Sequence, residues 1–494
     1  MSHSPAPGER SPQRRRFPRR RAALLAAAAV LVLGAAAPPT PEARGIGDRL
    51  FPHLGNPGYD IAAYDISLVY HANNQPLDAV TRFVARSTAQ LDDFNMDFTH
   101  GTIASVEVNG APAQFTPAGE DVVVTPTEPV SSGSSFTVTV HHTSDPRGEG
   151  EGGWVPTSDG LVMANQADAA HRVFPGNDHP SDKALFTFRV TAPKELTVVA
   201  NGLPAGQTTE GANTTWTYRT LHPMATELAQ VAIGRSTVPQ RGGPRGLKLR
   251  DVVPAADQKA LESWTAKTPD QIAWMEKRVG NYPFETYGVL IADASTGFEL
   301  ETQTLSLFER DVFTKAGFPE WYVESIMVHE LAHQWFGDSV SPRVWSDLWL
   351  NEGHATWYES LYAEERKGRK LVDRMRVAYQ LSDQMRADGG PPAAIKAPVP
   401  GKKISIFRPV CYDGSALVLY ALRQRIGTAA FDRLEREWVR RYHDSTATTA
   451  DFVALASEVS GQDQARFLQP WLYGRTTPPM PGHPDWKTTP PKPA

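Results

Sequence analysis

Residues 319–338 read PEWYVESIMVHELAHQWFGD, and this stretch decides the interpretation of the whole chain. A proline opens it and a glycine closes its apolar part, which predicts a helix with an H-E-x-x-H motif in its middle. His329 and His333 lie four residues apart, on one helical face, where both imidazoles can reach one metal ion. Glu330 projects beside the same site and can take a proton from metal-bound water. The stretch therefore predicts a hydrolytic metal centre.

A third metal ligand is predicted in residues 345–368, WSDLWLNEGHATWYESLYAEERKG. Ser346 is suited to the start of a helix and a glycine to its end, so Glu352 falls early in a second helix. Eighteen residues separate His333 from Glu352. Two histidines and a glutamate that leave one coordination position open are typical of catalytic zinc. This segment disfavours the alternative that the two histidines are ordinary core residues.

The two segments together resemble the gluzincin zinc aminopeptidases, the family of aminopeptidase N and leukotriene-hydrolase. HELAHQWFGD at 329–338 and WLNEG at 349–353 carry the likeness. QADAAHRVFPGNDHPSDKALFTF at 166–188 resembles the segment that closes the family's N-terminal β-saddle, and VSGQDQARFLQPWLY at 459–473 resembles the end of its catalytic domain. The resemblance covers about residues 50–475 and implies one zinc ion and peptide substrates.

The expected fold class is multidomain α+β. Short β-branched runs such as DISLVYH (65–71) and SFTVTVHH (135–142) predict a β-sandwich or saddle-shaped sheet before about residue 240. Helical periodicity dominates afterwards, and the resemblance implies a thermolysin-like, mostly helical catalytic domain. The predicted divisions are a signal peptide and cleavage region at 1–43, a β-saddle domain at 44–240, the zinc peptidase domain at 241–475 and a loose proline-rich tail at 476–494.

A tyrosine that stabilises the reaction's oxyanion is implied by the resemblance. The family places it before a glycine–alanine step, and YDGSA at 412–416 matches with serine at the usual glycine. Reading the match one residue earlier would put Cys411 at the tyrosine position, but the ALVLYALR that follows favours Tyr412. A phenol directed at a developing negative charge is a recognised oxyanion stabiliser. A half-buried core tyrosine is the alternative.

Substrate recognition is assigned by the same resemblance. In the family, the glutamate of a G-x-M-E-N loop binds the free N-terminal ammonium, and TGFELETQTLSLF at 296–308 follows a predicted strand in the same way. Alignment on E-x-Q-T makes Glu301 this glutamate, which would gain charge-assisted hydrogen bonds from the ammonium. Glu299, in the family's alanine position, could share the ammonium or face solvent. Gln166 matches the family glutamine that lines the first specificity pocket.

Two more residues lie close in sequence to the predicted ligands. His354 follows Glu352 and is expected to be a packing residue, because a fourth protein ligand would close a catalytic site. Glu359 lies seven residues after Glu352, on the same helical face, and is a candidate hydrogen-bond partner for a ligand histidine. A solvated glutamate is the alternative for this position.

The N-terminal residues resemble a secretory signal peptide. RRRFPRRR at 14–21 precedes the apolar run AALLAAAAVLVLGAAA at 22–37, which is shorter than the roughly 20 residues of a membrane span. Cleavage is expected between Ala36 and Ala43, with an uncleaved anchor as the alternative. We therefore expect a secreted protein with no stable membrane association after cleavage.

Composition excludes other classes of protein. A hydrophobic content of 40% with 21% charged residues is typical of a globular chain. Residues 1–37 hold seven arginines and one acid, so their removal changes the net charge from −5 to −11. Such an acidic chain is a poor candidate for binding nucleic acid. Cys411 is the single cysteine, which excludes an internal disulfide, and the sequence predicts no particular oligomeric state.

The predicted function is that of a zinc metallo-aminopeptidase, which hydrolyses the N-terminal peptide bond of short peptides by Glu330-assisted attack of zinc-bound water. A zinc endopeptidase or an epoxide hydrolase of the same family is the first alternative, favoured by the altered loop around Glu301. A non-catalytic zinc-binding protein and a purely structural zinc protein are the others. The resemblance also implies that the chain lacks the helical C-terminal domain of large relatives, so a more open site is expected.

Overall fold

The computed structural model describes residues 42–148, 150–315 and 317–492. The predicted signal peptide and cleavage region, at 1–43, lies outside the described residues except for its last two positions. Within the described ranges, no helix combines the length and the apolar character that a membrane crossing requires.

Alternating sequence in the first half of the chain forms one large sheet. In β1 (Tyr59–Val69) and β2 (Leu77–Ser87) the buried side chains recur at about every second position, because successive side chains point to opposite faces of a strand. Ten strands of the described chain join in the order β12-β13-β10-β1-β2-β7-β4-β5-β6-β3, with β1 and β10 parallel. The other strands of this sheet are β3 (Phe94–Asp97), β4 (Ile103–Val108), β5 (Ala111–Ala118), β6 (Asp121–Thr125), β7 (Ser135–Ser144), β10 (Leu185–Pro193), β12 (Leu203–Glu210) and β13 (Asn213–Arg219).

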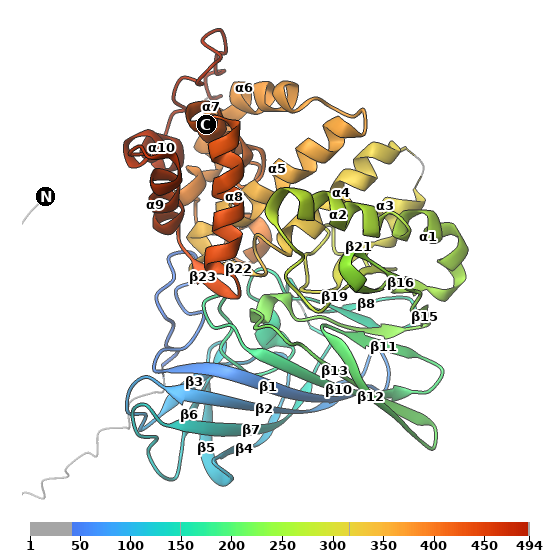
Figure 1. The fold of residues 1–494 in the computed structure, drawn as a ribbon. Coiled ribbons are helices and arrows are strands. Elements are labelled where there is room, and N and C mark those ends of the chain that lie inside the picture. Colours follow the sequence, from blue (N-terminus) through green and yellow to red (C-terminus); the bar gives the residue numbers. More distant parts are fainter. Residues whose placement is uncertain (1–41, 149, 316, 493–494) are drawn as a thin grey trace, which may run out of the picture. The chain divides into compact units, whose positions relative to one another are not determined.

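A smaller sheet lies between the large sheet and the helices (Figure 1). Its strands, in the order β11-β14-β9-β8, are β8 (Gly153–Pro156), β9 (Leu161–Ala164), β11 (Thr197–Ala200) and β14 (Val231–Gly234). All residues of β9 and β14 are buried, which is expected of strands covered on both faces. Their apolar side chains share one core with the large sheet and with Leu290, Leu300 and Leu307 from the second half of the chain. The two halves are therefore packed through a continuous core.

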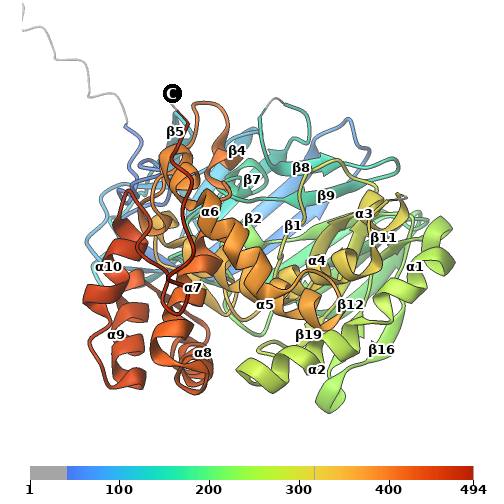
Figure 2. The same ribbon diagram turned by 90° about the horizontal axis from the view of Figure 1, so that it is seen from above.

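Helices dominate the second half of the chain. Figure 2 shows α9 and α10 on one side of the central helices and α1 on the other. The helices are α1 (Gln258–Thr265), α2 (Thr268–Val279), α3 (Arg310–Thr314), α4 (Glu320–His333), α5 (Trp349–Glu365), α6 (Leu371–Gly389), α7 (Asp413–Ile426), α8 (Thr428–Tyr442), α9 (Thr449–Ser460) and α10 (Ala465–Tyr473). The order of a β-rich half and a helical half is the α+β class that the sequence predicts.

Short strands occur at the passage from the first half to the second and within the helical half. They are β15 (Ser236–Thr237), β16 (Gln240–Gly242), β17 (Lys248–Arg250), β18 (Val253–Pro254), β19 (Thr286–Tyr287), β20 (Val289–Ala292), β21 (Ser306–Glu309), β22 (Val340–Pro342) and β23 (Ser445–Ala447). The sheet β16-β17-β19 joins two strands that precede the first helix, α1, to one strand that follows α2. The described chain from residue 42 onward forms one compact unit. The boundary expected between residues 240 and 241 therefore stays a prediction.

The helix that carries the H-E-x-x-H motif ends earlier than its sequence predicts. Pro319 caps α4 as expected, but the helix stops at His333 and Gly337 closes the turn that follows, with φ of +133°. The motif therefore occupies the end of the helix and not its middle. The second helix, α5, starts at Trp349, a few residues after the predicted Ser346, and Glu352 lies in its first turn.

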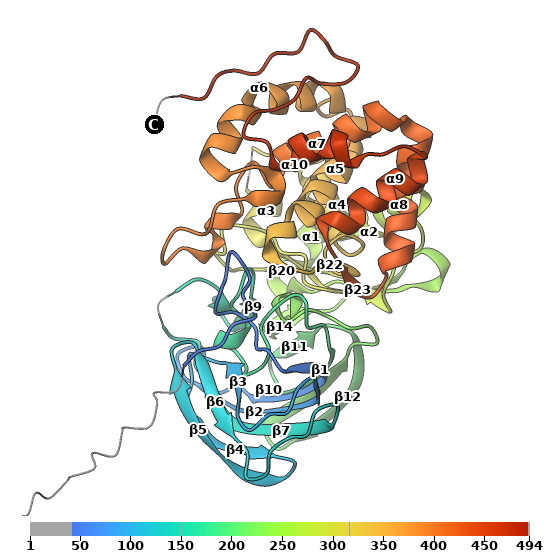
Figure 3. The same cartoon turned by 90° about the vertical axis from the view of Figure 1, so that its left-hand side faces the viewer.

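The proline-rich segment after residue 475 is not the loose tail that its composition predicts. Trp486 and Met480 are buried in the core of the helical half. The indole of Trp486 stacks on Tyr420 of α7, with ring centroids 5.9 Å apart, and contacts Tyr379 of α6. Figure 3 shows this segment running over α6 and α7. Trp486 and Met480 thus hold the segment in place although it has no regular secondary structure.

Lys183 connects the β-rich half to the segment that follows α4. Its ammonium donates hydrogen bonds to the backbone carbonyls of Asp338 (2.6 Å) and Ser339 (3.0 Å). Burial lowers the pKa of Lys183 to about 8, while neighbouring carboxylates oppose this shift. Because Asp338 lies five residues after His333, this contact holds the end of the motif helix against the β-rich half.

Candidate active site

The end of α4 and the start of α5 bring the three predicted ligands together. The Nε2 atom of His329 lies 3.3 Å from Oε2 of Glu352, and Nε2 of His333 lies 3.5 Å from the same oxygen. Ligand atoms about 2 Å from one tetrahedral zinc ion lie about 3.3 Å from each other. The donor set therefore fits zinc in both chemistry and spacing.

The other ring nitrogen of each histidine is already engaged. Nδ1 of His329 donates to Oε2 of Glu359 at 3.2 Å, and Nδ1 of His333 donates to the carbonyl of Phe336 at 3.0 Å. These bonds fix the tautomer that leaves both Nε2 atoms free to bind a metal. Glu359 is therefore the hydrogen-bond partner of a predicted ligand histidine, as its place in the sequence suggests, and that histidine is His329.

Glu359 is itself held by a half-buried positive charge. Arg374 of α6 donates to it at 2.7 Å and also to Asp413 at 2.8 Å. Burial alone would raise the pKa of Glu359, but Arg374 and His329 hold it down at about 2. A chain of charges therefore runs from α7 through α6 and α5 to His329, the predicted metal ligand on α4.

His354 is a packing residue, as the sequence predicts. Its imidazole is fully buried and stacks on Phe336, with ring centroids 4.4 Å apart. Its Nδ1 donates to the carbonyl of Leu350 at 2.6 Å, and its Nε2 lies 3.4 Å from a carboxylate oxygen of Glu435. The side chain is therefore committed to the core on the far side of α5 from the ligands.

Gly353 permits a close approach of two helices beside the ligand Glu352. A Cβ atom at this position would lie 2.8 Å from the Cβ of Ser415 on α7. Real side-chain atoms do not approach so closely, so a larger residue would push α7 away from α5. The hydroxyl of Ser415 instead donates to the carbonyl of Val410 at 3.0 Å.

The predicted base faces a cavity of about 480 Å³ that the ligands also line. Glu330 is buried, and its Oε2 atom has no hydrogen-bond partner among the described residues. Burial raises the pKa of Glu330 to about 8, and His329 and His333 oppose that rise. A buried carboxylate oxygen with no protein partner, beside a metal donor set, is placed to accept a proton from a water molecule.

The predicted oxyanion stabiliser lies across the metal site. Tyr412 precedes the first turn of α7 and lines the cavity, with its ring centroid 6.0 Å from that of His329. Burial and the Glu352 carboxylate raise the pKa of the phenol well above its ordinary value, so it keeps the proton that it must donate. Cys411, the alternative in the sequence, packs in a separate apolar cluster and donates to the carbonyl of Ile406.

The two predicted recognition residues contact each other although 135 positions separate them. The side-chain amide of Gln166 donates to Oε1 of Glu301 at 2.8 Å, and both side chains are buried at the cavity wall. Glu299 also lines the cavity, but its Oε2 accepts a hydrogen bond from the backbone of Glu309 at 3.0 Å. Glu299 is therefore partly tied to its own loop, and burial raises its pKa to about 7.

The distance between the recognition carboxylate and the base is short. Carboxylate oxygens of Glu301 and Glu330 and a ring nitrogen of His333 all lie within 4.8 Å of one another. Gln334, the residue after His333, donates its side-chain amide to the carbonyl of Glu301 at 3.0 Å. Its Oε1 accepts from the backbone of Thr304 at 2.8 Å. The recognition loop is thus fastened directly to the metal helix.

Two contributors to the site are missed in the sequence. Arg374 has charged neighbours in a sequence that is typical of an amphipathic helix, so it is predicted to lie on the solvated face. Gln334 lies next to the motif, but nothing in a single sequence shows that its side chain reaches a loop 33 residues earlier. Arg374 offers only a faint signal, which is that no acidic residue lies three or four positions away from it in the sequence.

Two stretches of the chain match profiles of one family. Residues 62–228 match the Peptidase M1 N-terminal domain, and residues 266–471 match the Peptidase family M1 domain. The chain belongs to peptidase family M1. This result confirms the resemblance to zinc aminopeptidases and the predicted order of a β-rich domain and a helical catalytic domain.

Individual relatives agree with that assignment. Aminopeptidase M1-C of Oryza sativa subsp. japonica is 26% identical over 340 residues, which cover 64% of this chain and 37% of the relative. The chain spans about a third of the length of such curated relatives. A solved structure, the M1 zinc metallopeptidase from Deinococcus radiodurans, is 26% identical with a TM-score of 0.75, covering 88% of this chain and 98% of that one.

One solved structure contains a peptide. A mutant of the Deinococcus radiodurans metallopeptidase, bound to a Tyr-Ser-Ala substrate, is 25% identical to this chain with a TM-score of 0.75. The match covers 89% of this chain and 99% of that one. The likeness in fold therefore extends over nearly the whole of a peptide-binding zinc metallopeptidase.

Replacing Glu359 by alanine should weaken zinc binding. The change removes the carboxylate that orients His329, and the loss of such an outer partner typically weakens metal affinity about 10–100-fold. Zinc competition with a chromophoric chelator measures the effect. Glu364→Ala, which removes an exposed glutamate of the same helix, is the matched control and should leave the affinity unchanged. Equal affinities in the two variants would contradict the role given to Glu359.

Proposed function

We propose that this chain is a zinc-dependent aminopeptidase that hydrolyses the first peptide bond of short peptides. The observation that carries the proposal is the separation of under 4.8 Å between the carboxylates of Glu301 and Glu330. A substrate ammonium bound by Glu301 leaves room for one residue before the base, so the bond presented to Glu330 is the N-terminal one. Membership of family M1 and the peptide-bound relative support the same substrate class.

One zinc ion is proposed at His329, His333 and Glu352. When bound there, zinc supplies Lewis-acid polarisation of a peptide carbonyl and acidifies water. Its three protein ligands leave the cavity side of the site open, which is the arrangement of catalytic sites.

The residues around the metal divide the chemistry between them. Glu330 takes the proton of the attacking water and passes it to the nitrogen of the leaving amine. Tyr412 donates its phenolic hydrogen to the oxygen on which negative charge develops. Glu301 accepts hydrogen bonds from the substrate ammonium, and Gln166 holds the Glu301 carboxylate in position. Binding at the ammonium orients the bond to be broken, which lowers the entropic part of the barrier.

Export through the N-terminal leader is proposed together with this activity. The basic and apolar segments at 14–21 and 22–37 support it, and the whole leader lies outside the described residues except for its last positions. Expression of the full chain in a secreting bacterial host should release a protein whose N-terminus falls between Ala36 and Ala43. Edman sequencing of the protein in the medium measures this, and full-length protein found only inside the cells would contradict export.

Glu330→Gln should abolish most turnover without loss of metal. The amide keeps the size of the side chain but cannot accept the proton, and general-base catalysis typically contributes about 10²–10⁴-fold. Steady-state kinetics on an amino-acyl p-nitroanilide and zinc analysis of the same sample measure the two quantities. Glu320→Gln, at the exposed start of the same helix, is the matched control. A Glu330→Gln enzyme with ordinary turnover would remove Glu330 from the mechanism.

Hydrolysis should require a free N-terminus. The enzyme should cleave alanyl and leucyl p-nitroanilides, a chelator should stop it, and the N-acetylated forms should not react. Glu301→Gln should lower kcat/KM for the free substrates about 10–100-fold, in line with one charge-assisted hydrogen bond of about 1.5–3 kcal/mol. Glu299→Gln should have a smaller effect, because the Glu299 carboxylate already accepts from Glu309. Chelator-sensitive cleavage of blocked peptides at internal bonds would instead identify an endopeptidase.

A further inference from the structure

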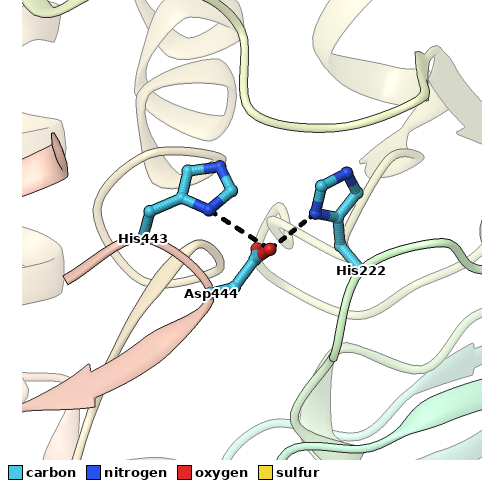
Figure 4. A group of neighbouring side chains, drawn as sticks. All are labelled: His222, His443 and Asp444. Carbon is cyan, nitrogen blue, oxygen red and sulfur yellow. Dashed lines mark hydrogen bonds and ion pairs between the residues drawn. The ribbon is translucent and has the colours of Figure 1, made fainter. Parts of the chain in front are cut away.

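A second group of metal-binding side chains lies away from the cavity. His222 belongs to the loop between β13 and β14, whereas His443 and Asp444 form the turn between α8 and β23. Figure 4 shows both imidazoles directed at the Asp444 carboxylate. One ligand atom from each residue lies within 4.8 Å of the other two. None of the three residues lines the cavity of the candidate active site.

The contacts within this group converge on one carboxylate oxygen. Oδ2 of Asp444 lies 2.7 Å from Nδ1 of His222 and 3.2 Å from Nδ1 of His443. The other oxygen, Oδ1, is shielded from solvent and has no hydrogen-bond partner among the described residues. Two imidazole nitrogens and a carboxylate with one unused buried oxygen form a donor set that divalent transition metals prefer. Small rotations of the rings would bring the three donors to the spacing of metal ligands.

The backbone holds these residues in place before any ion binds. Asp444 has φ of +57°, a left-handed conformation that aspartate adopts more readily than most residues. Its neighbour Ser445 donates to the carbonyl of Ser339 at 3.2 Å, where β23 pairs with β22. The ring of His222 packs against Phe284, with centroids 5.6 Å apart. Little conformational freedom is therefore lost when a metal binds.

The surroundings admit an ion from solvent and balance its charge. The side chains of His222, Asp444 and His443 are 28%, 26% and 39% exposed. The carboxylates of Asp444 and Glu285 both raise the pKa of His222, whereas the Lys183 ammonium lowers it. That ammonium is engaged by the carbonyls of Asp338 and Ser339. The site thus has two neighbouring carboxylates, those of Asp444 and Glu285, and one neighbouring cation, Lys183, which is already hydrogen-bonded elsewhere.

We propose that His222, His443 and Asp444 bind one divalent transition-metal ion such as Zn²⁺, separate from the proposed catalytic ion. The ion would join the loop after β13 to the turn before β23, across 221 positions of the sequence. Ligand binding to the folded chain alone stabilises it in proportion to the logarithm of the free metal concentration. The site is therefore a structural clamp between the β-rich and helical halves, and it is independent of the aminopeptidase proposal.

Zinc counting on the intact protein tests the proposal. The chain carrying one equivalent of zinc is equilibrated in buffers of increasing free zinc, and bound zinc per chain is measured together with the thermal midpoint. The wild type should take up a second equivalent, and its Tm should rise over the same zinc range. His222→Ala and His443→Ala should stay at one equivalent, with no rise in Tm. His141→Ala, which removes an exposed histidine of β7, is the matched control and should behave as the wild type.

Asp444→Asn provides a second variant that keeps the size of the side chain in case an alanine variant folds poorly. It should retain the catalytic equivalent and lose the second one, because the amide oxygen is a much weaker ligand than a carboxylate. A wild type that remains at one equivalent at saturating zinc would overturn the proposal. A second equivalent that persists in His222→Ala and Asp444→Asn would overturn it as well, because the ion would then be bound elsewhere.

Discussion

The structure depends on one electrostatic arrangement, in which two imidazoles and one carboxylate face each other with nearly all of their surface buried. Burial disfavours the charged form of Glu352, yet His333 and His329 hold the pKa of this carboxyl down at about 2. Burial likewise opposes protonation of His333, but Glu301 and Glu352 raise its pKa to about 9. Removal of one partner from such a set leaves an uncompensated buried charge, which is strongly destabilising. The predicted metal donors therefore contribute to holding α4 against α5.

The cavity is a joint product of both halves of the chain. The metal donors come from α4 and α5, whereas Gln166 comes from the segment after β9 in the β-rich half. The buried β9 and β14 strands and the Lys183 contact keep this segment in place against the catalytic helices. A change in how the halves pack would displace Gln166 from Glu301. The β-rich half thus contributes a wall of the site as well as stability.

The parts of the site that could be predicted from the sequence are those set by local geometry. His329 and His333 share a helical face by spacing alone, and Glu352 follows from the next helix and the family resemblance. The contact between Gln166 and Glu301 depends on tertiary packing, and only the resemblance placed each residue separately. Arg374 could not be assigned, because an arginine in a half-buried ion pair and a solvated arginine look alike in a helical sequence.

The errors in the prediction of the fold have physical causes as well. Gly337 was expected to end the motif helix, but the chain leaves the helix after His333 and uses the glycine for a later turn of positive φ. The tail after residue 475 lacks a periodic pattern, and its order comes from Trp486 and Met480 in the core. A periodic pattern predicts helices and strands. It does not predict whether a single aromatic side chain is buried in the core.

The clamp that Gln334 makes with the backbone at Glu301 and Thr304 has a consequence for how this enzyme class can diverge. In the proposed mechanism, the distance from the ammonium-binding Glu301 to the base Glu330 depends on one amide, that of Gln334 at the end of α4. Phe407 lines the same cavity from the segment between α6 and α7, outside the loop and the helix that these hydrogen bonds join. If the chain is the proposed aminopeptidase, a substitution at Phe407 can therefore change the side-chain preference without moving Glu301 relative to Glu330.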